Sequence, residues 1–146
     1  MRIVIALDSF KGSLTAAEAC QVVREVVEEE RPDWDVIAKP LADGGEGTAA
    51  ALTTANRGTS IEVPNVVGPL PDMRVSAAYG WLPHNRVAVV EMAQASGLPL
   101  LAETKRHPLL TTTFGTGQLI KAAAEQGAQR ILLSLGGSAT VDGGTG

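Results

Sequence analysis

The sequence contains few aromatic residues, one cysteine and no long apolar run. Phe, Trp and Tyr make up 3% of its 146 residues, so a core must consist mainly of Val, Leu, Ile and Ala. Cys20 has no second cysteine to pair with, which excludes an internal disulfide and gives no sign of an oxidising compartment. No segment approaches the ~20 apolar residues that cross a bilayer, and Asp8 and Lys11 interrupt the apolar start too early for a secretory signal. We therefore expect a cytoplasmic protein without a membrane partner.

An excess of basic residues is also missing. The chain has 12 Lys and Arg against 16 Asp and Glu, a net charge of −4, which does not fit a nucleic-acid-binding surface. A hydrophobic fraction of 45% with 19% charged residues argues against disorder. The composition therefore predicts a folded protein with no nucleic-acid partner.

Several familiar catalytic motifs are absent. The chain has no G-x-x-x-x-G-K-[ST] loop, no G-x-S-x-G elbow and no zinc-ligand spacing. Residues 115–117, Gly-Thr-Gly, lack the third glycine of the dinucleotide fingerprint, which disfavours an NAD-linked oxidoreductase. His84 and His107 stand in turn-like polar segments and are expected at the surface, whereas Cys20 stands on an apolar helix face and is expected in the core.

The order of apolar runs and turn signals predicts an α/β fold. Buried strands are expected at 2–7 and 34–38, with a helix over 16–30 between them. Thr15, followed three residues later by Glu18, has the spacing of a capping box at the start of that helix. A second helix is expected at about 48–56. This β-α-β-α order is typical of a parallel sheet with helical crossovers, as in Rossmann-like or flavodoxin-like lobes.

The middle of the chain has a different pattern. Closely spaced strands at 61–67, 73–79 and 87–92 predict an antiparallel meander, either a β-rich insertion or part of a second lobe. After an exposed linker, a helix at about 118–126 and a buried strand at 130–135 return to the α/β pattern.

These patterns predict two regions. Residues 1–59 and 108–146 would form an α/β lobe that binds an anionic small molecule, and residues 60–107 would form the β-rich part. A helix normally follows a buried strand and its glycine-rich turn. The sequence stops at Gly146, within such a turn, so we expect this lobe to be incomplete.

Three loops, residues 8–14, 41–47 and 136–146, follow predicted strands and carry the reactive side chains. The last loop has five glycines in 11 residues together with Asp142. Glycine lets backbone N–H groups approach an anion closely, and ligands bind beyond the carboxyl ends of parallel strands. If the three strands are parallel neighbours, their loops together supply acids, a lysine and N–H groups for a polyphosphate and a divalent metal. Each loop taken alone is equally well explained as an ordinary turn.

Six blocks of sequence, taken together, resemble the bacterial glycerate kinases of type I. They are IALDSFKGSL, PLADGGEGT, the VxGPL element at 66–70, VVEMAQASGL, KRHPLLTTTFGTGQLI and LGGSATVDGGTG, in the order and spacing of that family. The chain departs from the family pattern at Leu7, where proline is usual, and at Val141, where asparagine often precedes the aspartate. Neither departure changes one of the main polar residues.

The resemblance implies transfer of the ATP γ-phosphoryl group to a hydroxyl of D-glycerate with Mg²⁺, in a longer protein of two α/β lobes. A homodimer is one option for its assembly. With the loop chemistry, it suggests Asp8, Lys11 and Asp142 as catalytic residues and Asp43 and Glu46 as Mg²⁺ ligands. The residues expected to bind substrate or phosphate are Ser9, Gly44, Gly45, Thr112, Thr113, Gly136, Gly137 and Ser138. The competing hypothesis is a non-catalytic domain that binds a phosphorylated metabolite on the same scaffold.

Overall fold

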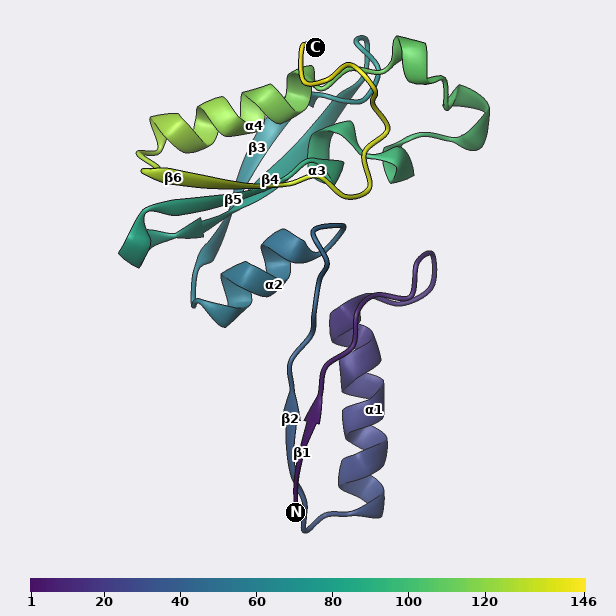
Figure 1. Cartoon of the computed structure of the whole chain (residues 1–146), viewed down its shortest axis with the longest axis vertical. Helices are drawn as coiled ribbons and strands as arrows, with labels where there is room; N and C mark the ends of the chain where they lie inside the picture. The colour runs from purple at the N-terminus through teal and green to yellow at the C-terminus, as the bar shows by residue number, and fades with distance from the viewer. The chain divides into compact units, whose positions relative to one another are not determined.

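Two units, residues 1–43 (unit 1) and residues 44–146 (unit 2), make up the computed structural model, which describes every residue of the chain (Figure 1). Unit 1 consists of β1 (Arg2–Ile5), α1 (Ala16–Glu30) and β2 (Asp35–Ala38). The two strands pair in parallel, and α1 forms the crossover between them. The first β-α-β element predicted from the sequence is thus confirmed.

Helix α1 begins at the predicted capping box. Thr15 Oγ1 accepts from the Glu18 N–H at 3.2 Å, and Glu18 Oε2 accepts from the Thr15 N–H at 2.8 Å. These bonds satisfy two N–H groups that the first helical turn would otherwise leave without partners.

The apolar face of α1 is only partly buried. Ala19 and Cys20 are buried, which confirms the core position expected for the cysteine. Val22, Val23 and Val26 are 51%, 39% and 56% exposed, although the sequence places them on the same apolar face. A sheet of two strands is narrow, and within unit 1 it covers only part of that face.

Unit 2 is built on a mixed sheet of β3 (Thr59–Val67), β4 (Arg74–Leu82), β5 (Val87–Glu91) and β6 (Arg130–Ser134), in that spatial order. Strands β3, β4 and β5 form the predicted antiparallel meander. β6 runs parallel to β5, with Glu91 opposite Ser134. The α/β class is therefore confirmed, but the last strand pairs with the meander and not with β1 or β2. The boundaries at 59/60 and 107/108 expected between the two regions stay a prediction.

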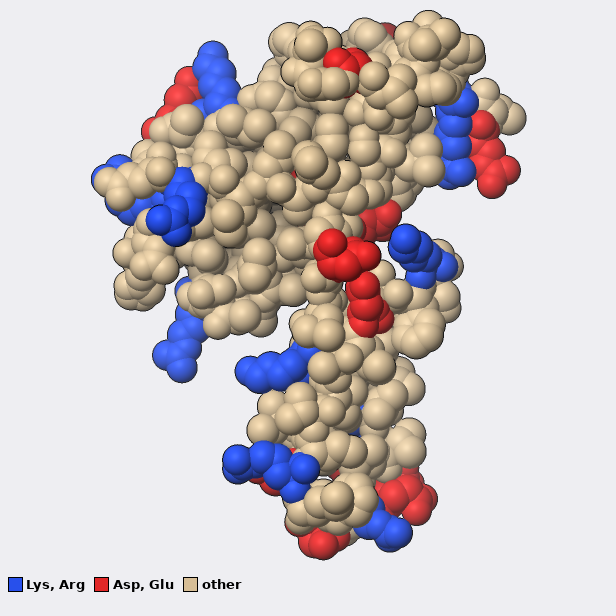
Figure 2. Space-filling view, viewed as in Figure 1, with Lys and Arg blue, Asp and Glu red and all other residues tan.

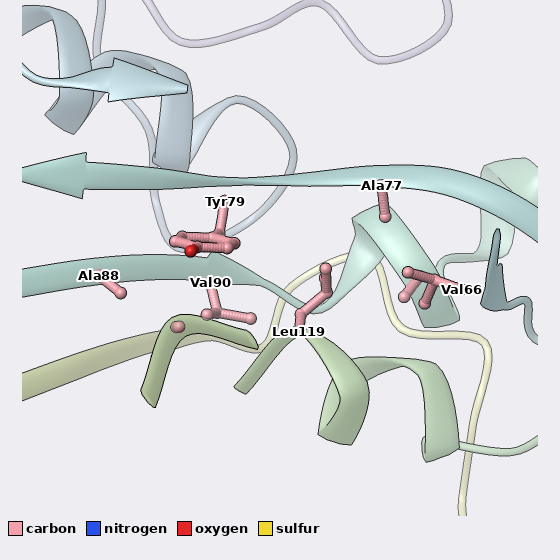
Figure 3. Packing of buried hydrophobic residues seen from close by; sticks show 8 residues of the cluster. Val66, Ala77, Tyr79, Ala88, Val90 and Leu119 are labelled. Carbon is pink, nitrogen blue, oxygen red and sulfur yellow. The ribbon is translucent and has the colours of Figure 1, made fainter. Parts of the chain in front are cut away.

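Helices cover both faces of this sheet. The helices are α2 (Thr48–Ala55), α3 (Ala93–Ser96) and α4 (Phe114–Glu125), and short 3₁₀ turns lie at Pro83–Asn85, Leu98–Leu100, Glu103–Lys105 and Pro108–Leu110. On one face Leu119 of α4 packs with Tyr79, Ala88 and Val90 (Figure 3). On the other face, Ala49 of α2 packs with Val87 and Val89. β5 is buried on both sides, as its apolar sequence requires.

Some boundaries differ from the sequence prediction. α4 begins at Phe114, earlier than the predicted 118, and β4 continues through Gly80 to Leu82, beyond the predicted end at 79. His84 and His107 are exposed, as expected. None of the helices combines the length and the apolar character needed to cross a membrane. On the side shown in Figure 2, Lys and Arg are dispersed among Asp and Glu and form no continuous basic surface.

Candidate functional site

Two glycine-rich loops of unit 2 lie in direct contact. Residues 44–47 lead into α2, and residues 135–138 follow β6. The Gly136 N–H donates to the Gly44 carbonyl oxygen at 2.8 Å. A Cβ at position 136 would lie 2.5 Å from Gly45 Cα, closer than any side chain allows. Two segments predicted to bind phosphate are therefore adjacent, and glycine is what permits their approach.

The second loop presents backbone N–H groups that have no partner in the protein. Gly136 N–H is occupied by Gly44, but the N–H groups of Gly137 and Ser138 make no hydrogen bond. Gly137 has φ +73°, a left-handed conformation that glycine adopts without strain. Successive free N–H groups in such a turn can bind an anionic oxygen. This part of the loop has the chemistry expected of a phosphate or carboxylate site.

Glu46 lies beside this loop. A Cβ on Gly137 would lie 3.5 Å from Glu46 Oε1, so the exposed carboxylate is near the free N–H groups. Glu46 also lines a cavity of about 260 Å³ together with Glu91, Ser76 and Gln94. The site thus combines an acid with N–H donors, which is suited to a metal–phosphate ligand.

Asp142 is held at the start of α4 by three donors. Thr113 donates its N–H to Asp142 Oδ2 at 2.8 Å and its hydroxyl to the same oxygen at 2.9 Å, while the Gly144 N–H donates to Oδ1 at 3.1 Å. Partial burial raises the pKa of the Asp142 carboxyl, but these donors together outweigh it and keep the pKa below the usual 3.8. Asp142 is therefore ionised at neutral pH, and both of its oxygens are engaged.

The threonines of the TTT segment have different surroundings. Thr113 is the N-cap residue of α4, and its N–H and hydroxyl are both directed at Asp142. Thr112 is half-buried; its N–H donates to the Pro69 carbonyl oxygen at 2.9 Å, and its Oγ1 accepts from Phe114 N–H at 3.1 Å. The Thr112 hydroxyl hydrogen has no acceptor and remains able to bind a ligand oxygen.

The remaining predicted site residues belong to unit 1. Asp8 and Lys11 are exposed, and Asp8 Oδ1 accepts from the Ser9 N–H at 2.6 Å. Asp43 is the last residue of unit 1 and is also exposed. The structure therefore brings together the predicted residues of unit 2, in two groups around Gly136 and Asp142. The convergence of all three loops stays a prediction.

The side chains in these loops that could bind a divalent metal are carboxylates. No group of three or more His, Cys, Asp or Glu side chains is arranged as a metal site. Mg²⁺ in phosphoryl-transfer enzymes usually has one or two carboxylates, and water and phosphate oxygens complete its coordination. Asp43 and Glu46, hard oxygen donors within one glycine-rich segment, fit that requirement by their chemistry.

One buried acid was not selected from the sequence. Glu91, at the end of β5, is 1% exposed, and its carboxylate accepts from the N–H groups of Gly47 and Ala49. The sequence feature that could have identified Glu91 is its position directly after the wholly apolar run Val87–Val90. A charged side chain at the end of a buried strand is costly unless it has partners.

Comparison with known proteins gives one consistent family. The family model described as "Glycerate kinase family" matches residues 3–146. A glycerate kinase from Bacillus subtilis is 49% identical over 146 residues, and a glycerate 2-kinase from Escherichia coli is 47% identical over 146 residues. Both alignments include 100% of this chain and 38% of the relative.

A solved structure gives the same result for the fold. The crystal structure of a protein from Salmonella typhimurium LT2, assigned as glycerate kinase 2, superposes with a TM-score of 0.79 at 47% identity. The superposition covers 100% of this chain and 38% of the chain in that crystal structure. The 146 residues thus span well under half the length of the proteins they match.

Proposed function

Because the chain belongs to the glycerate kinase family, we propose that the full-length protein transfers the γ-phosphoryl group of ATP to a hydroxyl of D-glycerate. The observation that carries this proposal is the contact between the glycine loops at 44–47 and 135–138. It sets free N–H groups beside the Glu46 carboxylate. Phosphoryl transfer depends mainly on positioning and on neutralising charge, and this arrangement supplies both.

We assign the anion-binding part of the site to the second loop. The N–H groups of Gly137 and Ser138 would bind phosphate or carboxylate oxygens, and the Thr112 hydroxyl would bind another oxygen of the same ligands. Gly136 and Gly44 act through their contact, which fixes the spacing of the loops. Asp43 and Glu46 would hold Mg²⁺, which, when bound, neutralises charge on the phosphates.

The unit 1 residues complete the proposal. Lys11 would neutralise charge on the transferred group or bind the glycerate carboxylate. Asp8 would accept the proton of the attacking hydroxyl, or orient that hydroxyl. We prefer Asp8 to Asp142 for this role because both Asp142 oxygens already accept bonds from Thr113 and Gly144. A low pKa also makes Asp142 a weak base.

The test is ADP formation by the purified full-length protein with ATP and Mg²⁺, in the presence and absence of D-glycerate. We expect glycerate-dependent turnover, with a phosphoglycerate that ³¹P NMR identifies by the position of the ester. The Escherichia coli relative is a glycerate 2-kinase, so the 2-phosphate is the product to look for first. Binding of glycerate or phosphoglycerate without turnover would support the non-catalytic alternative instead.

A further inference from the structure

Glu91 is a buried carboxylate whose partners are backbone N–H groups. It ends the fully buried strand β5 and is 1% exposed. No Lys, Arg or His forms an ion pair with it. Its Oε1 and Oε2 lie 3.2 and 3.1 Å from the Gly47 nitrogen, and Oε2 lies 3.1 Å from the Ala49 nitrogen. A buried charge is costly unless hydrogen bonds compensate it, so these bonds must be maintained for the fold to tolerate Glu91.

These bonds hold the first glycine loop at one place on the sheet. Gly47 is the N-cap residue of α2, has φ 90° and provides no side chain to cap the helix. Glu91 supplies the missing cap from a strand more than 40 residues away in sequence. Since Gly47 is the residue after Glu46, the position of the Glu46 backbone depends directly on this anchor.

The Glu46 side chain lies between this anchored loop and the second glycine loop. Glu46 and Glu91 line the same cavity of about 260 Å³, and Glu46 is beside Gly137 of the second loop. The Gly136 N–H joins the second loop to the first by donating to the Gly44 carbonyl oxygen. Hydrogen bonds thus connect strand β5 to the first glycine loop and the first glycine loop to the second, and Glu46 lies among these three segments.

We propose that Glu91 is a positioning residue of the glycerate kinase reaction, which acts by fixing the 44–47 loop so that Glu46 faces the second glycine loop. This inference rests on the proposed function. It differs from a purely structural cap of α2, which would affect stability but not the turnover of folded protein.

The test compares Glu91→Gln, Glu46→Gln and the double variant in the full-length protein, with Glu125→Gln as the matched control. In Glu91→Gln the new side chain would place an amide NH₂ against the Gly47 N–H, so one oxygen acceptor becomes a donor. Glu125 is an exposed acid at the end of α4, and it pairs only with Lys121 at the surface. We expect Glu91→Gln to lower kcat per folded molecule by about 10–100-fold, with the KM for D-glycerate changed by less than about twofold. Glu125→Gln should leave both constants unchanged.

The double variant distinguishes positioning from independent effects. If Glu91 acts through Glu46, the double variant should be no slower than the slower single variant, because the second change removes nothing further. Losses in kcat that multiply in the double variant would overturn the proposal. So would a Glu91→Gln protein whose only defect is a lower melting temperature.

Amide hydrogen exchange gives a readout that does not depend on activity. In Glu91→Gln, the Gly47 and Ala49 amides should exchange at least about tenfold faster, while amides in β4 keep their protection. If the unaltered protein shows no glycerate-dependent turnover, the proposed function fails. The anchoring role is tested separately: it is overturned if the Gly47 and Ala49 amides exchange at the same rate in Glu91→Gln as in the unaltered protein. If the unaltered protein is active and Glu91→Gln is equally active, only the inference about Glu91 fails.

Discussion

Asp142 illustrates how a single carboxylate can be organised by its neighbours. Its pKa is lower in the folded protein than in the unfolded chain, because the donors of Thr113 and Gly144 outweigh partial burial. Ionised Asp142 therefore stabilises the folded loop above about pH 4, and this contribution is lost as the pH falls through the lowered pKa.

We expect an NMR pH titration to place the Asp142 midpoint below 3.8. Thr113→Val removes the hydroxyl donor and should raise that midpoint, since fewer bonds favour the ionised form. Thr54→Val, in the exposed part of α2, serves as the control and should leave it unchanged. A midpoint at or above 3.8 in the unaltered protein would contradict the bonding described for Asp142.

Lys11 is the residue of unit 1 for which charge matters most in the proposed reaction. It is exposed and has no acidic partner within ion-pair distance, so removing its side chain should not disturb the fold. In the full-length protein, we expect Lys11→Ala to lower kcat by at least about 100-fold with an unchanged circular dichroism spectrum. Lys121→Ala, on the surface of α4, should keep normal activity. Near-normal turnover by Lys11→Ala would remove Lys11 from the site.

At the scale of elements, the contact between the two glycine loops makes a specific prediction about stability. Gly136→Ala would place a Cβ 2.5 Å from Gly45 Cα and 2.8 Å from the Gly44 carbonyl oxygen. Both obstacles are backbone atoms, so the loops must separate. We expect the free energy of unfolding, measured by urea denaturation, to fall by about 1–3 kcal/mol.

Gly117→Ala is the matched control for this substitution. Position 117 lies within α4, and a Cβ there meets nothing within 4 Å. Because alanine favours a helix over glycine, this variant should be unchanged or more stable by up to about 1 kcal/mol. Equal stability of Gly136→Ala and Gly117→Ala would show that the loops are not in the close contact described here.

The elements that could be predicted from sequence are those fixed by local signals. α1 occupies Ala16–Glu30 as expected, because Thr15 and Glu18 define its start within one turn. α4 was predicted to start too late, since Gly115 and Gly117 lower the helical propensity of its first turn. That turn is stabilised from outside, where Asp142 accepts the Thr113 N–H, and such a contact is not visible in a local pattern.

Contacts between segments that are distant in sequence could not be predicted from the sequence. The apolar run 130–135 predicted a strand correctly, but nothing in it specifies β5 as the neighbour. The same limit applies to Glu91, whose partners Gly47 and Ala49 lie on another element. The meeting of the glycine loops was expected only if their strands were parallel neighbours, but β6 pairs with β5 and not with β2. The contact between Gly136 and Gly44 therefore has another basis than the one that the sequence suggested.

At the scale of the whole molecule, the exposed apolar side chains are the informative feature. Leu132, Leu133 and Leu135, in and after the edge strand β6, are 43%, 42% and 61% exposed, although this strand was expected to be buried. Val22 and Val26 of α1 are likewise more than half exposed. Apolar surface of this kind on an edge strand usually marks an interface or causes association. The chain spans 38% of the length of its Bacillus subtilis relative, and the rest of that relative has no counterpart among these residues.

We therefore expect residues 1–146 expressed alone to bind a hydrophobic dye, to self-associate at micromolar concentration and to form no ADP in response to D-glycerate. Kinases enclose both substrates to exclude water, and we expect the proposed reaction to need surfaces outside these two units for that enclosure. Leu133→Thr should decrease dye binding by the isolated residues, because it removes an exposed apolar side chain. In the full-length protein the same substitution should lower the melting temperature, because Leu133 would there be buried. Glycerate-dependent ADP formation by residues 1–146 would contradict the need for further surfaces. An unchanged melting temperature of full-length Leu133→Thr would show that Leu133 is exposed to solvent in the full-length protein as well.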